Sequence, residues 1–118
     1  MMRPRHDIKN VFLCVPPMDF RRSINGLSQV VQSVLGMDPF QEALFVFTNR
    51  DRDKIKILYW ERNGFCLWQK RLERERFKWP THVSDGTITM DGEMLNWLLD
   101  GFDLWRSPPH KSLFFRSV

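Results

Sequence analysis

The sequence predicts one small α+β domain, built as an antiparallel three-stranded meander with helices packed on one face. Three observations lead to this expectation. Three successive segments have the composition of strands, two apolar stripes of helical spacing flank them, and 118 residues with 42% hydrophobic residues suffice for one core. The domain is expected over residues 11–104, after an N-terminal arm at residues 1–10 and before a C-terminal tail at residues 105–118.

The first two elements are a short strand and a helix. An apolar run at residues 11–15 predicts the strand, which the pair Pro16-Pro17 ends because proline lacks a backbone donor. The helix is expected to have Asp19 as its N-cap and to stop at Gly36. Its apolar residues recur at spacings of three and four: Ile24, Leu27, Val30, Val31, Val34 and Leu35. Because they cover one face only, this helix should pack on a sheet.

The sheet is expected next in the chain. Its strands are predicted from branched and aromatic residues at 43–48, 54–60 and 65–70. The last two should form a hairpin, since Asn63-Gly64 tolerates the positive φ angles of a type I′ turn. Lys54 and Lys56 alternate with isoleucines, so we expect one apolar sheet face and the two lysines on the other.

A short strand at residues 87–89 and a second helix complete the domain. Asp91 is the expected N-cap of this helix, and Gly101 lies near its end. Its core side should carry the apolar residues Met94, Leu95, Trp97, Leu98, Leu99 and Phe102.

Charge is distributed unevenly along the chain. The net charge is +4, yet residues 50–78 carry ten basic and five acidic side chains, and residues 79–105 carry five acidic side chains and no Lys or Arg. A basic segment attracts phosphate, although a solvated strand face with salt-bridging neighbours explains the same composition. The candidate nucleic-acid-binding residues are Arg21, Lys54, Lys56, Lys70, Arg71, Arg74, Arg76 and Lys78. The neighbouring aromatics Trp60, Trp68, Phe77 and Trp79 are expected in the core rather than stacked on bases.

The acidic segment is a candidate surface for a basic protein partner. Its candidate residues are Asp91, Glu93, Asp100 and Asp103.

Arg21 is included among the candidate nucleic-acid-binding residues for a different reason. A cation in the first turn of a helix is mildly unfavourable, so Arg21 should face a carboxylate of the fold or an external anion.

Enzyme signatures are missing from the sequence. The three histidines are scattered, the two cysteines are not in a Cys-x-x-Cys arrangement, and the glycines form no phosphate-binding loop. We therefore expect no catalytic residues, no metal, no cofactor and no small-molecule substrate. No apolar run reaches the roughly 18 residues that span a bilayer, so we expect no membrane association and a cytoplasmic protein with free thiols.

Several short stretches also resemble one known family. They are Asp19-Phe-Arg21, Asn25-Gly-Leu27, Asp38-Pro-Phe40, Leu44-Phe-Val-Phe47, Lys56-Ile-Leu58, Asn63-Gly-Phe-Cys66, Lys70-Arg-Leu-Glu73, Arg76-Phe-Lys-Trp-Pro80 and Leu98-Leu-Asp-Gly101. In this order they resemble the TnpB accessory protein that the second open reading frame of IS66-type insertion sequences encodes. The resemblance covers about residues 11–104. The chain departs from the family at Glu42 and Glu75, where glycine is usual.

The resemblance implies a role in transposition, beside a separate transposase that cuts and joins DNA, and it brings no established catalytic residues. Two hypotheses follow. In the first, a non-enzymatic accessory factor contacts DNA phosphates, or the transposase–DNA complex, through its basic hairpin. In the second, the protein bridges other transposition proteins without binding DNA itself.

Overall fold

The computed structural model describes residues 4, 7–80 and 86–105. The elements, in chain order, are β1 (Val11–Cys14), α1 (Ile24–Ser33), β2 (Leu44–Thr48), β3 (Lys54–Glu61), β4 (Gly64–Arg71), β5 (Thr87–Met90) and α2 (Gly92–Leu99). The sequence predicted each of these strands and helices, with boundaries that differ by a few residues. The C-terminal tail beyond Trp105 lies outside the described residues, as do the three histidines.

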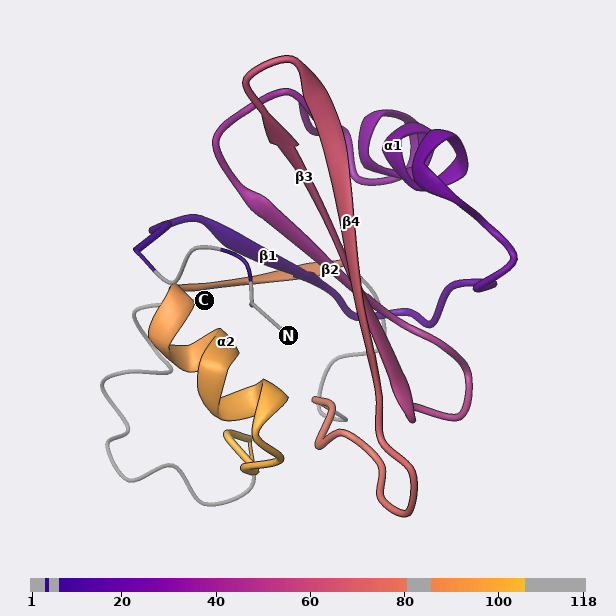
Figure 1. Cartoon of the computed structure of the whole chain (residues 1–118), viewed down its shortest axis with the longest axis vertical. Coiled ribbons are helices and arrows are strands. Elements are labelled where there is room, and N and C mark those ends of the chain that lie inside the picture. The colour runs from indigo at the N-terminus through magenta and orange to yellow at the C-terminus, as the bar shows by residue number, and fades with distance from the viewer. Residues whose placement is uncertain (1–3, 5–6, 81–85, 106–118) are drawn as a thin grey trace.

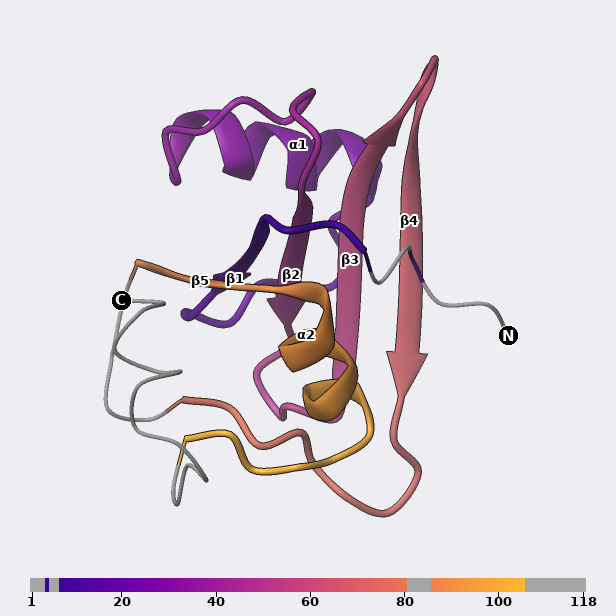
Figure 2. The same cartoon turned by 90° about the vertical axis from the view of Figure 1, so that its left-hand side faces the viewer.

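The five strands form one mixed sheet in the order β4-β3-β2-β1-β5, which Figure 2 shows from side to side. Strands β2, β3 and β4 are the predicted antiparallel meander, with Val46 opposite Ile57 and Ile57 opposite Trp68. The expectation of a three-stranded sheet is nevertheless wrong. Strand β1 joins the meander by pairing in parallel with β2, and β5 then pairs antiparallel with β1.

The expectation that both helices cover one face is also wrong, because α1 and α2 lie on opposite sides of the sheet (Figure 1). Strands β1 and β2 are parallel neighbours, so the chain between them must cross over one face, and α1 is that crossover. Strand β5 leads into α2 from the far edge of the sheet, and α2 covers the other face. The architecture is α+β with a helix on each side.

Each face of the sheet therefore has its own core. On the α2 side, alternate strand residues such as Leu13, Val46 and Ile57 are fully buried together with Leu98 of α2. On the α1 side the buried residues are Cys14, Leu27, Val30, Val31, Ala43, Phe45, Phe47 and Leu58. The apolar stripes of the helices are confirmed except at their ends, since Val34 and Phe102 are exposed.

Two local predictions about termini and turns need correction. Helix α1 begins five residues after Asp19, with Ser23 in the N-cap position, so Asp19 is not its cap. In the β3–β4 hairpin Glu61 pairs with Gly64, and the positive φ of 54° falls on Arg62 rather than on the Asn63-Gly64 pair. The helix stop at Gly36 is confirmed by its left-handed φ of 65°.

Part of the expected N-terminal arm contributes to the domain. Ile8 is 8% exposed within the α2-side core, and the carbonyl of Asn10 accepts a hydrogen bond from the Leu44 amide at 3.0 Å. Ordered contacts thus extend to residues before the predicted boundary at residue 11.

Candidate nucleic-acid interface

Basic side chains gather at one end of the strands, where β1 and β2 end, β3 begins and β4 ends. Three chain segments meet there: residues 15–23, 49–53 and 72–80. We call this surface the basic edge and define it by Arg21, Arg22, Arg50, Arg52, Lys54, Arg71, Arg74, Arg76 and Lys78. The parallel pairing of β1 with β2 is what brings the first two segments to the same edge.

The loop between β2 and β3 is organised by one side chain, Asn49. Its amide oxygen accepts a hydrogen bond from the Lys54 amide at 3.1 Å, and its amide nitrogen donates to the Asp53 carboxylate. The Asn49 carbonyl also accepts from the amide of Arg52, which has a left-handed φ of 61°. The hydrogen bond from Asn49, together with the nearby charges of Lys54 and Arg71, lowers the pKa of Asp53. The loop is thus a compact turn with an ionised carboxylate inside it.

The segment after β4 is held against this turn. The amide of Leu72 donates to the Asp53 carbonyl at 2.8 Å, and the amide of Phe77 donates to the Arg52 carbonyl at 2.7 Å. Phe77 and Trp79 are buried, and the Trp79 indole donates to the Val15 carbonyl at 3.0 Å. The core assignment of these two aromatics is confirmed.

Burial of Phe77 and Trp79 determines where their neighbours lie. Because side chains alternate over residues 76–79, Arg76 and Lys78 are exposed, and Arg74 is exposed in the bend before them. The other two tryptophans that the sequence placed in the core are only partly buried. Trp68 packs against the α2-side core, and Trp60 lies with Phe40 and Phe65 in a cluster of rings.

Two of the predicted lysines hold the fold together. The Lys56 ammonium donates to the carbonyls of Phe20 and Arg22, both at 2.9 Å, and lies 4.9 Å from the centre of the Phe20 ring. Burial, and to a smaller degree the charge of Lys54, lower the pKa of Lys56. On the opposite face the Lys70 ammonium donates to the Leu99 carbonyl at 2.8 Å, at the C-terminus of α2. Because both ammonium groups bind carbonyls of the fold, neither Lys56 nor Lys70 belongs to the basic edge.

Arg21 lies before α1 and not in its first turn, so the prediction from the helix dipole is wrong, although one of its two expected partners, a carboxylate of the fold, is present. Its guanidinium forms a two-pronged contact with the Asp19 carboxylate, at 2.6 and 3.0 Å, and its backbone amide donates to the same group at 2.9 Å. These bonds lower the pKa of Asp19 to about 2. The Arg21 side chain is nonetheless 92% exposed, so the outer side of the guanidinium faces solvent.

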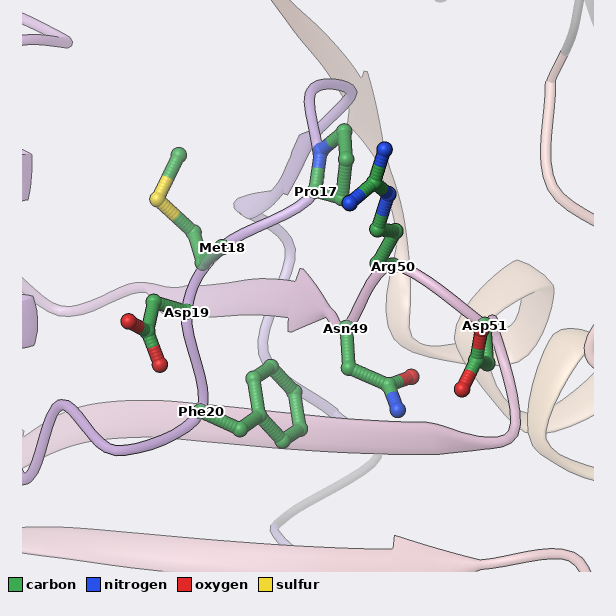
Figure 3. A pocket seen from close by; sticks show the side chains of 7 residues that line it. All are labelled: Pro17, Met18, Asp19, Phe20, Asn49, Arg50 and Asp51. Atoms are coloured by element: carbon green, nitrogen blue, oxygen red, sulfur yellow. The ribbon is translucent and has the colours of Figure 1, made fainter.

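A shallow open pocket of about 450 Å³ lies between the segments that follow β1 and β2 (Figure 3). Its lining residues are Pro17, Met18, Asp19, Phe20, Asn49, Arg50 and Asp51. Figure 3 shows that Arg50 is the one basic side chain among these seven, beside two carboxylates. Such a mixed lining gives the pocket little preference for an anion.

The predicted acidic residues lie before, on and after α2. The end of α2 borders the segment that follows β4, since Gly101 lies beside the Glu75 carboxylate and the Trp105 indole donates to the Lys78 carbonyl at 2.7 Å. Asp91 is the confirmed N-cap of α2, accepting from the Met94 amide at 2.8 Å. Asp103 accepts from the Trp105 amide at 3.0 Å, while Glu93 and Asp100 are exposed. The Asp91 and Asp103 carboxylates therefore accept local backbone hydrogen bonds.

Sequence reasoning omitted Arg22, Arg50 and Arg52 from the basic set. In the loop of residues 49–53 the arginines alternate with aspartates, a pattern that favours local salt bridges. Among the described residues, however, ion pairs join Arg21 to Asp19 and Arg71 to Glu73. This alternation was the sequence feature that could have pointed to Arg50 and Arg52. In the structure the Asp53 carboxylate accepts a hydrogen bond from the Asn49 side chain instead of pairing with an arginine.

The described residues contain no group of three or more side chains able to hold a metal ion. In the same part of the chain, neither helix has the length and hydropathy needed to cross a membrane.

Comparison with known proteins gives the family. The model of the family described as IS66 Orf2 like protein matches residues 9–109. Two relatives from Sinorhizobium fredii are similar along most of their length. Uncharacterized protein y4hO is 36% identical over 107 residues, 91% of each chain, and uncharacterized protein y4jC is 35% identical over 106 residues, 90% of this chain and 89% of the relative. No solved structure matches the chain. The chain therefore belongs to the IS66 Orf2-like family of accessory proteins associated with transposition.

Proposed function

We propose that the protein is a non-enzymatic accessory factor that contacts DNA phosphates through the basic edge during transposition. The observation that carries this proposal is the convergence of unpaired cations. No hydrogen bond or ion pair to another described residue engages the side chains of Arg22, Arg50, Arg52, Lys54, Arg74, Arg76 and Lys78. They come from three chain segments that backbone hydrogen bonds tie together, so the cations are presented from a rigid support.

The composition of the edge favours contact with phosphates over reading of bases. Five carboxylates lie among the cations, which lowers the local charge: Asp19, Asp51, Asp53, Glu73 and Glu75. Helix α1 has no basic residue, and α2 carries the acidic Glu93, so neither resembles a recognition helix for the major groove. Binding should therefore be largely independent of sequence and sensitive to salt.

The test measures the affinity of the purified protein for duplex DNA across a salt series. A double variant, Arg74→Gln with Arg76→Gln, should weaken binding and reduce the slope of log K against log salt by about 2. The control removes two exposed cations near the other end of the sheet, Lys9→Gln with Arg62→Gln, and should leave the slope nearly unchanged. Equal effects of the two pairs of substitutions, or binding without salt dependence, would refute the proposal that the basic edge contacts DNA phosphates.

A second candidate function rests on the acidic residues of α2. Glu93 and Asp100 are exposed, and residues 86–105 contain no basic side chain, so this surface suits a basic partner protein and repels phosphate. In this alternative the chain bridges other transposition proteins of the same element. A pull-down of those proteins after nuclease treatment separates the two functions. Loss of the complex with the nucleic acid would exclude the bridging role.

A further inference from the structure

Strand β4 is the long edge of the sheet. Its eight residues pair with β3 in eight successive positions without a bulge, and no described segment pairs with its outer side. Figure 2 shows it as the last strand on that side of the sheet. Part of its backbone N–H and C=O groups therefore point away from the sheet, with no strand of residues 4, 7–80 and 86–105 to receive them.

The usual protections of an edge strand are weak in β4. It contains no proline, and its charged residues are confined to its last two positions, Lys70 and Arg71. The opposite edge, β5, has only four residues. A long, regular edge with an uncharged centre is a template on which another strand can add.

Two complementary groups lie at opposite ends of β4 on the same sheet face. At the first end, Phe40, Trp60 and Phe65 form a cluster with ring centres 4.9 to 5.3 Å apart, and Phe40 is 51% exposed. At the other end is Arg71, whose side chain is 56% exposed. Phe65 and Arg71 are six residues apart, so both point to the α1 side of the sheet.

We propose that β4 pairs antiparallel with β4 of a second copy of this chain, which joins two sheets into one. A two-fold axis perpendicular to the sheet keeps each face on its own side, and with Trp68 on the axis Phe65 lies opposite Arg71 of the second copy. Each guanidinium then meets the ring cluster of the other copy, a cation–π contact made twice. A parallel arrangement would instead place Arg71 beside Arg71, with like charges together.

The existing ion pair of Arg71 is compatible with this contact. Its guanidinium lies 3.0 Å from the Glu73 carboxylate, but both side chains are exposed, so the pair contributes little to stability. The flat face of a guanidinium can stack on a ring while its edge keeps a carboxylate partner.

The first test is the mass of the pure protein in solution without DNA, measured by sedimentation equilibrium over a concentration series. We expect a species of twice the 14.2 kDa chain mass. A monomer at every concentration would overturn the proposal. Because the sample contains no DNA, this result does not depend on the proposed function.

A cysteine pair tests the register. With Trp68 on the axis, residue 70 lies opposite Cys66 of the second copy, so Lys70→Cys should form an intermolecular disulfide under mild oxidation. Within one chain the two positions are about 13 Å apart, too far for a bond. The control adds Cys66→Ser to the same variant and should stay uncrosslinked, since the remaining Cys14 is buried. A dimer that never crosslinks here contradicts the proposed pairing.

The cation–π contact has its own matched pair of variants. Arg71→Ala should raise the dissociation constant of the dimer about 5- to 30-fold, because the two-fold axis repeats the contact. Arg76→Ala removes an exposed arginine outside β4 and should leave the constant unchanged. Both substitutions are at exposed positions, so circular dichroism should show intact folding. Equal dimer affinities of the two variants would overturn the contact.

Discussion

Replacement of Lys56 by methionine tests whether this lysine supports the fold. Methionine keeps the apolar length of the side chain and removes the ammonium. Lys56 is 8% exposed, and its ammonium donates to the carbonyls of Phe20 and Arg22. These bonds fasten the segment before α1 to the centre of β3, 34 to 36 residues away along the chain. The variant should therefore loosen the entry to α1.

The size of the effect follows from the two bonds. A hydrogen bond from a charged donor contributes about 1.5–3 kcal/mol. The methionine variant no longer buries a charge, and water can reach the freed carbonyls of partly exposed loop residues, so part of the loss is recovered. We expect the free energy of unfolding to fall by about 2 kcal/mol, and Tm to fall by about 8 °C for a chain of this size.

The assay is urea unfolding followed by circular dichroism, with Lys54→Met as control. Lys54 lies two residues away on the same strand and face, and its ammonium has no partner among the described residues, so its replacement should cost less than about 0.5 kcal/mol. The DNA affinity of folded Lys56→Met protein should equal that of the wild type. Wild-type stability with weakened DNA binding would refute the structural role and return Lys56 to the interface.

Three further outcomes are expected. Asp91→Ala removes the N-cap bond of α2 and should lower the free energy of unfolding by about 1 kcal/mol in urea titrations. NMR titration should place the pKa of Asp19 at about 2, and Arg21→Ala should return this pKa toward 3.8 with folding nearly unchanged. The stabilising contribution of the Asp19–Arg21 pair is full above pH 3.8 and is lost as pH falls through about 2. A thiol reagent should modify Cys66 quickly and Cys14 only on unfolding, because burial raises the pKa of Cys14 to about 11; equal rates would contradict the buried position.

Elements of secondary structure were predictable because their causes are local. The apolar spacing of α1 and the Asp91 cap of α2 each act within a few residues, and both occur in the structure. The expectation of a single apolar face on β3 is wrong, because Ile55 and Ile57 lie in one core and Leu58 lies in the other. The error at Asp19 has a local cause. Its carboxylate binds Arg21, two residues ahead, and a competing partner of this kind removes a capping residue from its role.

The composition of the basic edge was partly predictable for the same reason. Arg76 and Lys78 alternate with Phe77 and Trp79, so burial of the two aromatics turns these cations to solvent. The contribution of Arg22 and Arg50 was not predictable, because it depends on β1 and β2 ending at the same edge. That juxtaposition comes from strand pairing between residues more than thirty positions apart.

By itself the sequence determined the family, the order of the elements and the β3–β4 hairpin, since these depend on local spacing and on residue identity. Only the tertiary structure decided which lysines are free. Strand periodicity places Lys54 and Lys56 on one face but does not say what covers that face. The parallel β1–β2 pair requires a crossover, which places α1 on the lysine side, and its entry segment covers Lys56 while Lys54 remains at the rim. Lys70 is likewise engaged because α2 folds onto the opposite face and ends beside it.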